Sequence, residues 1–165
     1  MAFDSQHSAT LSPGYRLLGG RAFAGSQPFN EQCRDLKSQG ITYVISFTGK
    51  DDNVEATQRA SVACNINWRW MPFTQTLDCT DAEQAMMWEY LHEMRQLLIE
   101  GESLYMHCDE ANKRCGLMFF ALCHACSLPS ANAYPALISQ LASQAHSLPR
   151  AELQWAASLG TSLPY

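Results

Sequence analysis

Apolar and polar residues alternate along the chain in patterns that predict strands and helices in turn. Short runs rich in β-branched and aromatic residues predict buried strands at residues 15–18, 41–47, 68–73 and 103–106. Apolar residues at helical spacing predict helices at residues 28–39, 54–64, 114–126, 131–145 and 151–159, with a further long helix before the last strand. Because strands and helices alternate, we predict an α/β fold with a central, mostly parallel sheet flanked by helices.

Local signals mark where several of these elements end. Thr80 with Glu83 fits a capping box that opens the long helix, and Gly101 ends that helix. Gly40 lies just past the first helix and fits a C-cap. The Gly19-Gly20 pair predicts a turn after the first strand, and the pattern assigns no element to the residues from there to 27.

The composition suits one compact domain, because 47% of the 165 residues are hydrophobic and 16% are charged. We expect the aperiodic residues 1–14 to form a flexible lead-in and residues 15–165 to form this domain. The net charge of −5, without a Lys/Arg cluster, argues against a nucleic-acid-binding protein. No apolar run approaches the ~18 residues of a transmembrane helix, and no secretory signal is evident, so we expect a cytoplasmic protein.

The seven cysteines indicate reduced thiols rather than a disulfide framework, since their number is odd and no secretory signal precedes them. At least one thiol is therefore a candidate for chemistry. Cys123, His124 and Cys126, with Cys115 and His107, form an alternative candidate for a zinc site. Core packing is favoured over zinc, because Cys123 and Cys126 lie one turn apart in an apolar helix and no second ligand pair has finger-like spacing. We expect neither a metal nor a nucleotide cofactor, since the glycine-rich nucleotide-binding motifs are absent.

The candidate active site is the polar loop that joins the strand at 103–106 to the apolar helix after it. Cys108 follows the strand, five residues intervene, and Arg114 opens the helix. Such a loop can direct its backbone N–H groups to one point at the positive end of the helix dipole, which stabilises a thiolate and a phosphate above it. We therefore expect the pKa of Cys108 to be lowered and the planar guanidinium of Arg114 to hold two phosphate oxygens. The alternative is a buried core cysteine beside a surface arginine.

His-Cys-x5-Arg at the end of a strand resembles the signature of the cysteine-dependent protein tyrosine phosphatases, and the chain length resembles their dual-specificity branch. The resemblance covers residues 15–126, and residues 36–41 are similar to the kinase-associated phosphatase subgroup. It implies a protein tyrosine phosphatase-like fold and hydrolysis of phosphomonoesters through a phosphocysteine, without a cofactor. By the same resemblance Cys108 is the nucleophile, Arg114 clamps the phosphate, and His107 helps to hold the thiolate in place.

In this family an aspartate on the loop before the preceding helix donates a proton to the leaving oxygen. Asp78 and Asp81 are both available here. Asp78 is favoured, because Asp81 lies in the first turn of a helix, where a carboxylate is stabilised by the dipole without a catalytic role.

The loop departs from the family pattern at three positions. Ala111 and Lys113 stand where glycine is usual, and Cys115 stands where Ser or Thr is usual, which predicts slower hydrolysis of the phosphocysteine. Asp109 and Glu110 add negative charge, whereas Lys113 indicates an anionic substrate. The residues that we assign to substrate binding are His107, Asp109, Glu110, Ala111, Asn112, Lys113 and Cys115.

Two classes of function follow from these features. The first is a phosphatase, acting on phosphotyrosine, phosphoserine or phosphothreonine in proteins, or on a phosphoinositide or inositol phosphate. The second is a catalytically weak phosphatase-like domain that binds phosphorylated partners, for which the departures at Ala111, Lys113 and Cys115 are the reason. The expected partner is thus a phosphorylated protein, a phosphorylated small molecule or a lipid headgroup; the sequence does not predict the oligomeric state.

Overall fold

The computed structural model describes residues 13–49, 53–109 and 112–164 of the chain. The strands are β1 (Tyr15–Leu17), β2 (Gly20–Gly25), β3 (Tyr43–Ser46), β4 (Asn67–Trp70) and β5 (Ser103–His107). The helices are α1 (Asn30–Ser38), α2 (Val54–Ala63), α3 (Asp81–Ile99), α4 (Lys113–Ala125), α5 (Ser130–Leu141) and α6 (Arg150–Thr161), and a 3₁₀ helix, Ala142–Ser147, follows α5. The expected lead-in at 1–14 falls mostly outside the described residues.

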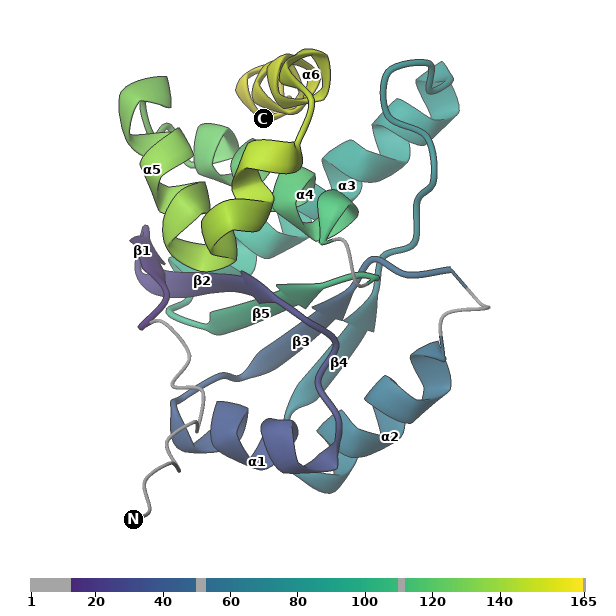
Figure 1. Cartoon of the computed structure of the whole chain (residues 1–165), viewed down its shortest axis with the longest axis vertical. Coiled ribbons are helices and arrows are strands. Elements are labelled where there is room, and N and C mark those ends of the chain that lie inside the picture. Colours follow the sequence, from purple (N-terminus) through teal and green to yellow (C-terminus); the bar gives the residue numbers. More distant parts are fainter. Residues whose placement is uncertain (1–12, 50–52, 110–111, 165) are drawn as a thin grey trace.

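The strands form one sheet in the order β1-β2-β5-β3-β4. Only β1 runs antiparallel to its neighbour, and the other pairs are parallel. Figure 1 shows α1 and α2 on one face of this sheet and α3 to α6 on the other. The prediction of an α/β fold with a mostly parallel sheet and flanking helices is therefore confirmed.

The two faces of the sheet carry separate apolar cores, because side chains alternate along each strand. Leu104 and Met106 of β5 belong to the larger core under α3 to α6, whereas Tyr105 belongs to the smaller core toward α1 and α2. Almost every side chain of α4 is buried, as its apolar sequence predicts. The end of β5 and the start of α4 are thus fixed from both sides, and the loop between them lies at the carboxyl edge of the sheet.

Strand β2 is the main element that the sequence pattern does not predict. Gly19 does turn the chain, together with Leu18, but the residues after this turn pair with both β1 and β5. Their Ala and Gly content disfavours a strand by intrinsic propensity. Close packing explains these small residues: a Cβ on Gly20 would collide with the Glu102 carbonyl oxygen, and one on Gly25 would lie 2.6 Å from the Tyr105 hydroxyl.

Two predicted boundaries are also wrong. The helix expected at 131–145 ends at Leu141, because Ala142 adopts a left-handed φ of 52° and a 3₁₀ helix follows. The strand expected at 68–73 ends at Trp70, and residues 71–80 form an irregular segment that leads to α3. Within the described ranges, no helix is both long and apolar enough to cross a lipid bilayer.

Candidate active site

Cys108 lies at the carboxyl edge of the sheet, directly after β5. Its side chain is buried, and its Sγ accepts a hydrogen bond of 3.2 Å from the backbone N–H of Cys115 in the first turn of α4. An N–H at a helix N-terminus is among the donors that stabilise an anion best. Of the loop residues assigned to substrate binding, Glu110 and Ala111 lie outside the described residues.

The pKa of the Cys108 thiol is lowered from its ordinary value. The largest cause is the neighbouring Cys115 thiol, and the Cys115 backbone N–H and Arg114 lower the pKa further. Burial and the negative charge of Asp109 raise it in part. The Cys115 Sγ also lies 3.6 Å from the Asn112 carbonyl oxygen, but an ionised sulfur is the stronger acceptor. Burial, with Cys108 nearby, raises the pKa of Cys115 well above its usual range. Cys115 therefore keeps its proton, and its thiol also lies 3.7 Å from the Asn112 side-chain amide.

Asn112 shapes the loop between Cys108 and α4. Its φ of 56° is left-handed, a conformation that Asn tolerates better than most residues. Its side chain is only 3% exposed and meets the Gln144 amide at 2.6 Å. With its amide nitrogen turned toward β2, it donates to the carbonyl oxygens of Gly25 at 3.0 Å and Asp109 at 3.2 Å. The Asn112 side chain thus holds the loop against the protein.

His107 is held by a hydrogen-bonded chain that starts on β4. The Trp68 indole N–H donates to the Ser46 hydroxyl oxygen at 3.0 Å, and that oxygen lies 2.6 Å from His107 Nε2. Because an indole only donates, the Ser46 hydroxyl can give its own hydrogen to Nε2. The imidazole proton then sits on Nδ1, which faces the Cys108 carbonyl oxygen at 3.4 Å. Burial lowers the pKa of His107 to about 4, so the ring is neutral near pH 7.

The buried His107 predicts a loss of stability in mild acid. The unfolded chain takes up this proton below pH 6.5, whereas the folded chain resists it down to about pH 4. The free energy of unfolding is therefore unaffected by protonation of His107 above pH 6.5 and decreases as the pH falls toward 4. The decrease is up to about 3 kcal/mol, at 1.36 kcal/mol per pKa unit.

Urea unfolding measured between pH 7 and pH 4 tests this pH dependence. His107→Gln should reduce the change of unfolding free energy with pH, and the exposed control His92→Gln should show the same change as the parent. An unchanged pH dependence in His107→Gln would mean that His107 is not the group responsible.

Arg114 links the loop to the segment that follows β4. Its Nη1 donates to the Phe73 carbonyl oxygen at 3.3 Å, and its Nη2 lies 3.3 Å from Asp109 Oδ2. The side chain is 17% exposed, so the guanidinium is held at the rim of the site rather than in open solvent. Arg114 also lowers the pKa of nearby Cys108.

Lys113, which the sequence assigns to an anionic substrate, contacts a carboxylate of the protein itself. Its Nζ lies 2.7 Å from Glu152 Oε1 near the start of α6. The other oxygen of Glu152 accepts a hydrogen bond of 2.7 Å from the Thr76 hydroxyl. Glu152 therefore connects the loop to the irregular segment before α3.

Asp78 and Asp81 occupy different parts of that segment's end. The Cys79 N–H donates to the Thr76 carbonyl oxygen at 3.3 Å, so the exposed Asp78 lies inside a hydrogen-bonded turn. Asp81 is the first residue of α3, and the predicted capping box of Thr80 forms there. Figure 1 shows this segment rising from the edge of the sheet to the start of α3. Asp78 is thus an exposed residue of this turn, and its role as the acid stays a prediction.

Residues from other elements hydrogen-bond to or form ion pairs with the site, and the sequence pattern does not predict them. They are Ser46, Trp68, Phe73, Gln144 and Glu152. No local spacing points to the last three. Ser46 had a weak signal, because it lies one residue before the end of the strand predicted at 41–47, and in the sheet it pairs directly with His107.

Among the described residues, no three His, Cys, Asp or Glu side chains form a group that could hold a metal ion. Cys123 is buried in the large core, where burial raises the pKa of its thiol.

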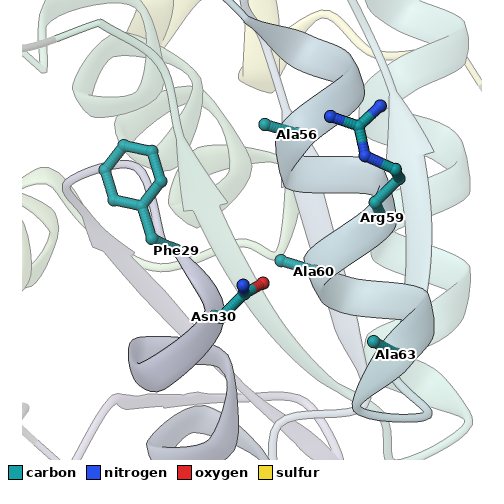
Figure 2. Close-up of a pocket in the computed structure, with 6 residues that line it drawn as sticks. All are labelled: Phe29, Asn30, Ala56, Arg59, Ala60 and Ala63. Carbon is teal, nitrogen blue, oxygen red and sulfur yellow. The ribbon is translucent and has the colours of Figure 1, made fainter.

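A groove of about 310 Å³ lies elsewhere, between the start of α1 and the length of α2. Figure 2 shows the Phe29 ring and the Arg59 guanidinium on its two walls. Its lining contains no residue of the Cys108–Arg114 loop, so this groove is separate from the candidate active site.

Comparison with known proteins finds relatives in structure but not in sequence. No protein-family model matches the chain, and no curated protein matches it. Tk-PTP in its active form superposes with a TM-score of 0.66 at 14% identity, over 90% of this chain and 97% of that one. PTPMT1 in complex with PI(5)P superposes with a TM-score of 0.61 at 12% identity, over 86% of this chain and 92% of that one. Kinase associated phosphatase, with its catalytic-site cysteine replaced by serine, superposes with a TM-score of 0.59 at 16% identity, over 89% of this chain and 94% of that one.

These similarities establish the fold. The chain has the fold of the protein tyrosine phosphatases, as the resemblance of its Cys-x5-Arg segment implies.

Proposed function

We propose that this protein is a cysteine-dependent phosphatase that hydrolyses phosphotyrosine, phosphoserine or phosphothreonine in proteins through a phosphocysteine. One observation carries the proposal: Cys108 Sγ accepts the Cys115 N–H at the start of α4, and the pKa of this thiol is lowered. A buried cysteine that served only for packing would have a raised pKa, as Cys123 does.

In the first step the Cys108 thiolate attacks phosphorus, and the bond from phosphorus to the ester oxygen breaks. Asp78 gives its proton to the departing oxygen, so an alcohol or phenol leaves. Arg114 and the loop N–H groups hold the phosphoryl oxygens, where negative charge is stabilised by fixed donors. Neighbouring Cys115 stays protonated and donates toward the sulfur.

In the second step water attacks phosphorus and the phosphorus–sulfur bond breaks. The Asp78 carboxylate takes a proton from the water, inorganic phosphate leaves, and Cys108 returns to the thiolate. A thiol donates a weaker hydrogen bond than the usual hydroxyl, so we expect Cys115 to make this step slower than a Ser or Thr would. A chemistry that needs a free thiolate is best preserved in a reducing compartment, which supports a cytoplasmic location.

Asp78→Asn tests the acid of this mechanism. We expect kcat/KM, which reports the first step, to fall about 10²–10⁴-fold for phenyl phosphate, whose leaving group must be protonated, and much less for p-nitrophenyl phosphate. The basic limb of the pH profile should disappear as well. Asp81→Asn is the matched control and should keep both properties of the parent. If Asp81→Asn loses them and Asp78→Asn does not, the acid is Asp81.

A phosphoinositide or inositol phosphate is the second candidate substrate. The structural similarity to PTPMT1, solved with PI(5)P, favours it. Phosphate release from a phosphotyrosine peptide and from PI(5)P, compared by kcat/KM, separates the two. Binding of both without release from either would instead support a phosphate-binding domain with little catalysis.

A further inference from the structure

Glu152 is a buried carboxylate that contacts two segments far apart in sequence. It lies in the first turn of α6 and is 7% exposed. One carboxylate oxygen pairs with the Lys113 ammonium and the other accepts from the Thr76 hydroxyl, both at 2.7 Å. Each carboxylate oxygen therefore serves a different segment.

The helix dipole alone does not account for the two short contacts of Glu152. A carboxylate in the first turn of a helix is favoured by the dipole, but this effect does not require burial or side-chain partners. Burial alone would raise the pKa of Glu152, yet Lys113 and Thr76 outweigh burial and lower it. In the ion pair Arg69–Glu93 both side chains are exposed, at 46% and 43%, and pairs of that kind contribute little. In the Lys113–Glu152 pair, by contrast, the lysine is 48% exposed and the carboxylate side chain only 9%.

The segment that Glu152 holds is the one that carries Asp78. Thr76 begins the turn closed by the Cys79 N–H, and Asp78 lies within it. Nearer β4, the Phe73 carbonyl oxygen accepts from Arg114. The Cys108–Arg114 loop is thus attached to this segment at Phe73 directly and at Thr76 through Glu152.

We propose that Glu152 is a positioning residue that fixes the Asp78 turn against the Cys108–Arg114 loop through its contacts with Thr76 and Lys113. The proposal rests on the proposed function, in which Asp78 is the acid. An acid must lie within hydrogen-bond reach of the leaving oxygen, and a displacement of about 1 Å can lower the rate up to 10²-fold.

Thr76→Val is the sharpest test, because it removes one hydroxyl and leaves the Lys113–Glu152 pair in place. We expect kcat/KM for phenyl phosphate to fall about 10-fold, with kcat/KM for p-nitrophenyl phosphate changed less than about twofold. The basic limb of the pH profile should weaken, and inhibition by inorganic phosphate should be unchanged. Thr74→Val, an exposed threonine of the same segment, is the matched control and should match the parent.

Glu152→Gln provides a second variant with the same expected selectivity between the two substrates, and Glu93→Gln controls for the loss of an ion pair. Thr76→Val combined with Asp78→Asn should lose no more on phenyl phosphate than Asp78→Asn alone, because both act through one group. Equal losses on the two substrates, additive losses in the double variant, or parent-like rates in both Thr76→Val and Glu152→Gln would overturn the proposal.

Asp78→Asn, measured beside these variants, separates the acid role of Asp78 from the positioning role of Glu152. If Asp78→Asn shows the selective loss and the Glu152 and Thr76 variants do not, only the positioning role fails. If Asp78→Asn itself shows no selective loss, the acid assignment fails, and the positioning role fails with it.

Discussion

Replacement of Cys108 by serine is expected to abolish turnover of p-nitrophenyl phosphate, with a loss of roughly 10⁴-fold or more. The donors around this sulfur favour its ionised form, and they lower the pKa of the Cys108 thiol from its ordinary value. A serine hydroxyl at the same place remains protonated, so no nucleophile forms. The N–H of Cys115 and the Arg114 guanidinium are still present in this variant, and affinity for inorganic phosphate should therefore persist.

Cys64→Ser is the matched control, since Cys64 is a half-buried cysteine at the end of α2. It should retain the activity of the parent. Near-parent activity in Cys108→Ser, measured by release of p-nitrophenol and with phosphate binding followed by calorimetry, would place the chemistry at another residue.

Arg114→Lys should lower kcat/KM for the same substrate by about 10²–10³-fold, the range for loss of a fixed donor to the reacting oxygens. A lysine keeps the charge but cannot present two parallel N–H groups to a phosphoryl group. It also cannot keep both contacts that Arg114 makes, one with the Phe73 carbonyl oxygen and one with Asp109. The loss should therefore appear in kcat and in the inhibition constant for phosphate.

Arg69→Lys controls for an Arg-to-Lys change at an exposed ion pair and should leave both constants unchanged. Parent-like kinetics in Arg114→Lys would mean that a point charge suffices, and the bidentate role of Arg114 would be wrong.

The fold was predictable where local physics decides the structure. Helix α3 begins at the capping box of Thr80 and Glu83, as predicted, because that signal is contained in four consecutive residues. Strand β2 was missed because its Gly20 and Gly25 are explained only by their contacts with Glu102 and Tyr105. These contacts form between segments far apart in sequence, so no local pattern contains them.

The same division holds in the site. Cys108 and Arg114 come from one short loop, whose strand and helix were visible in the sequence, and their proximity follows from the loop itself. Glu152 reaches the loop only because α6 packs against α4. Lys113, interpreted from its charge alone, was assigned to substrate, and its contact with Glu152 could not be anticipated.

Rapid acid quench of the protein during turnover of p-nitrophenyl phosphate, followed by mass spectrometry of its peptides, shows directly whether a phosphocysteine forms at Cys108. We expect one phosphoryl group on the peptide that contains Cys108, present during turnover in the parent and absent after the substrate is exhausted. In the proposed mechanism the weaker hydrogen bond of the Cys115 thiol slows the breakdown of this intermediate, so we expect it to accumulate. Turnover at the parent rate with no phosphoryl group on Cys108 at any time would show that Cys108 is not the nucleophile.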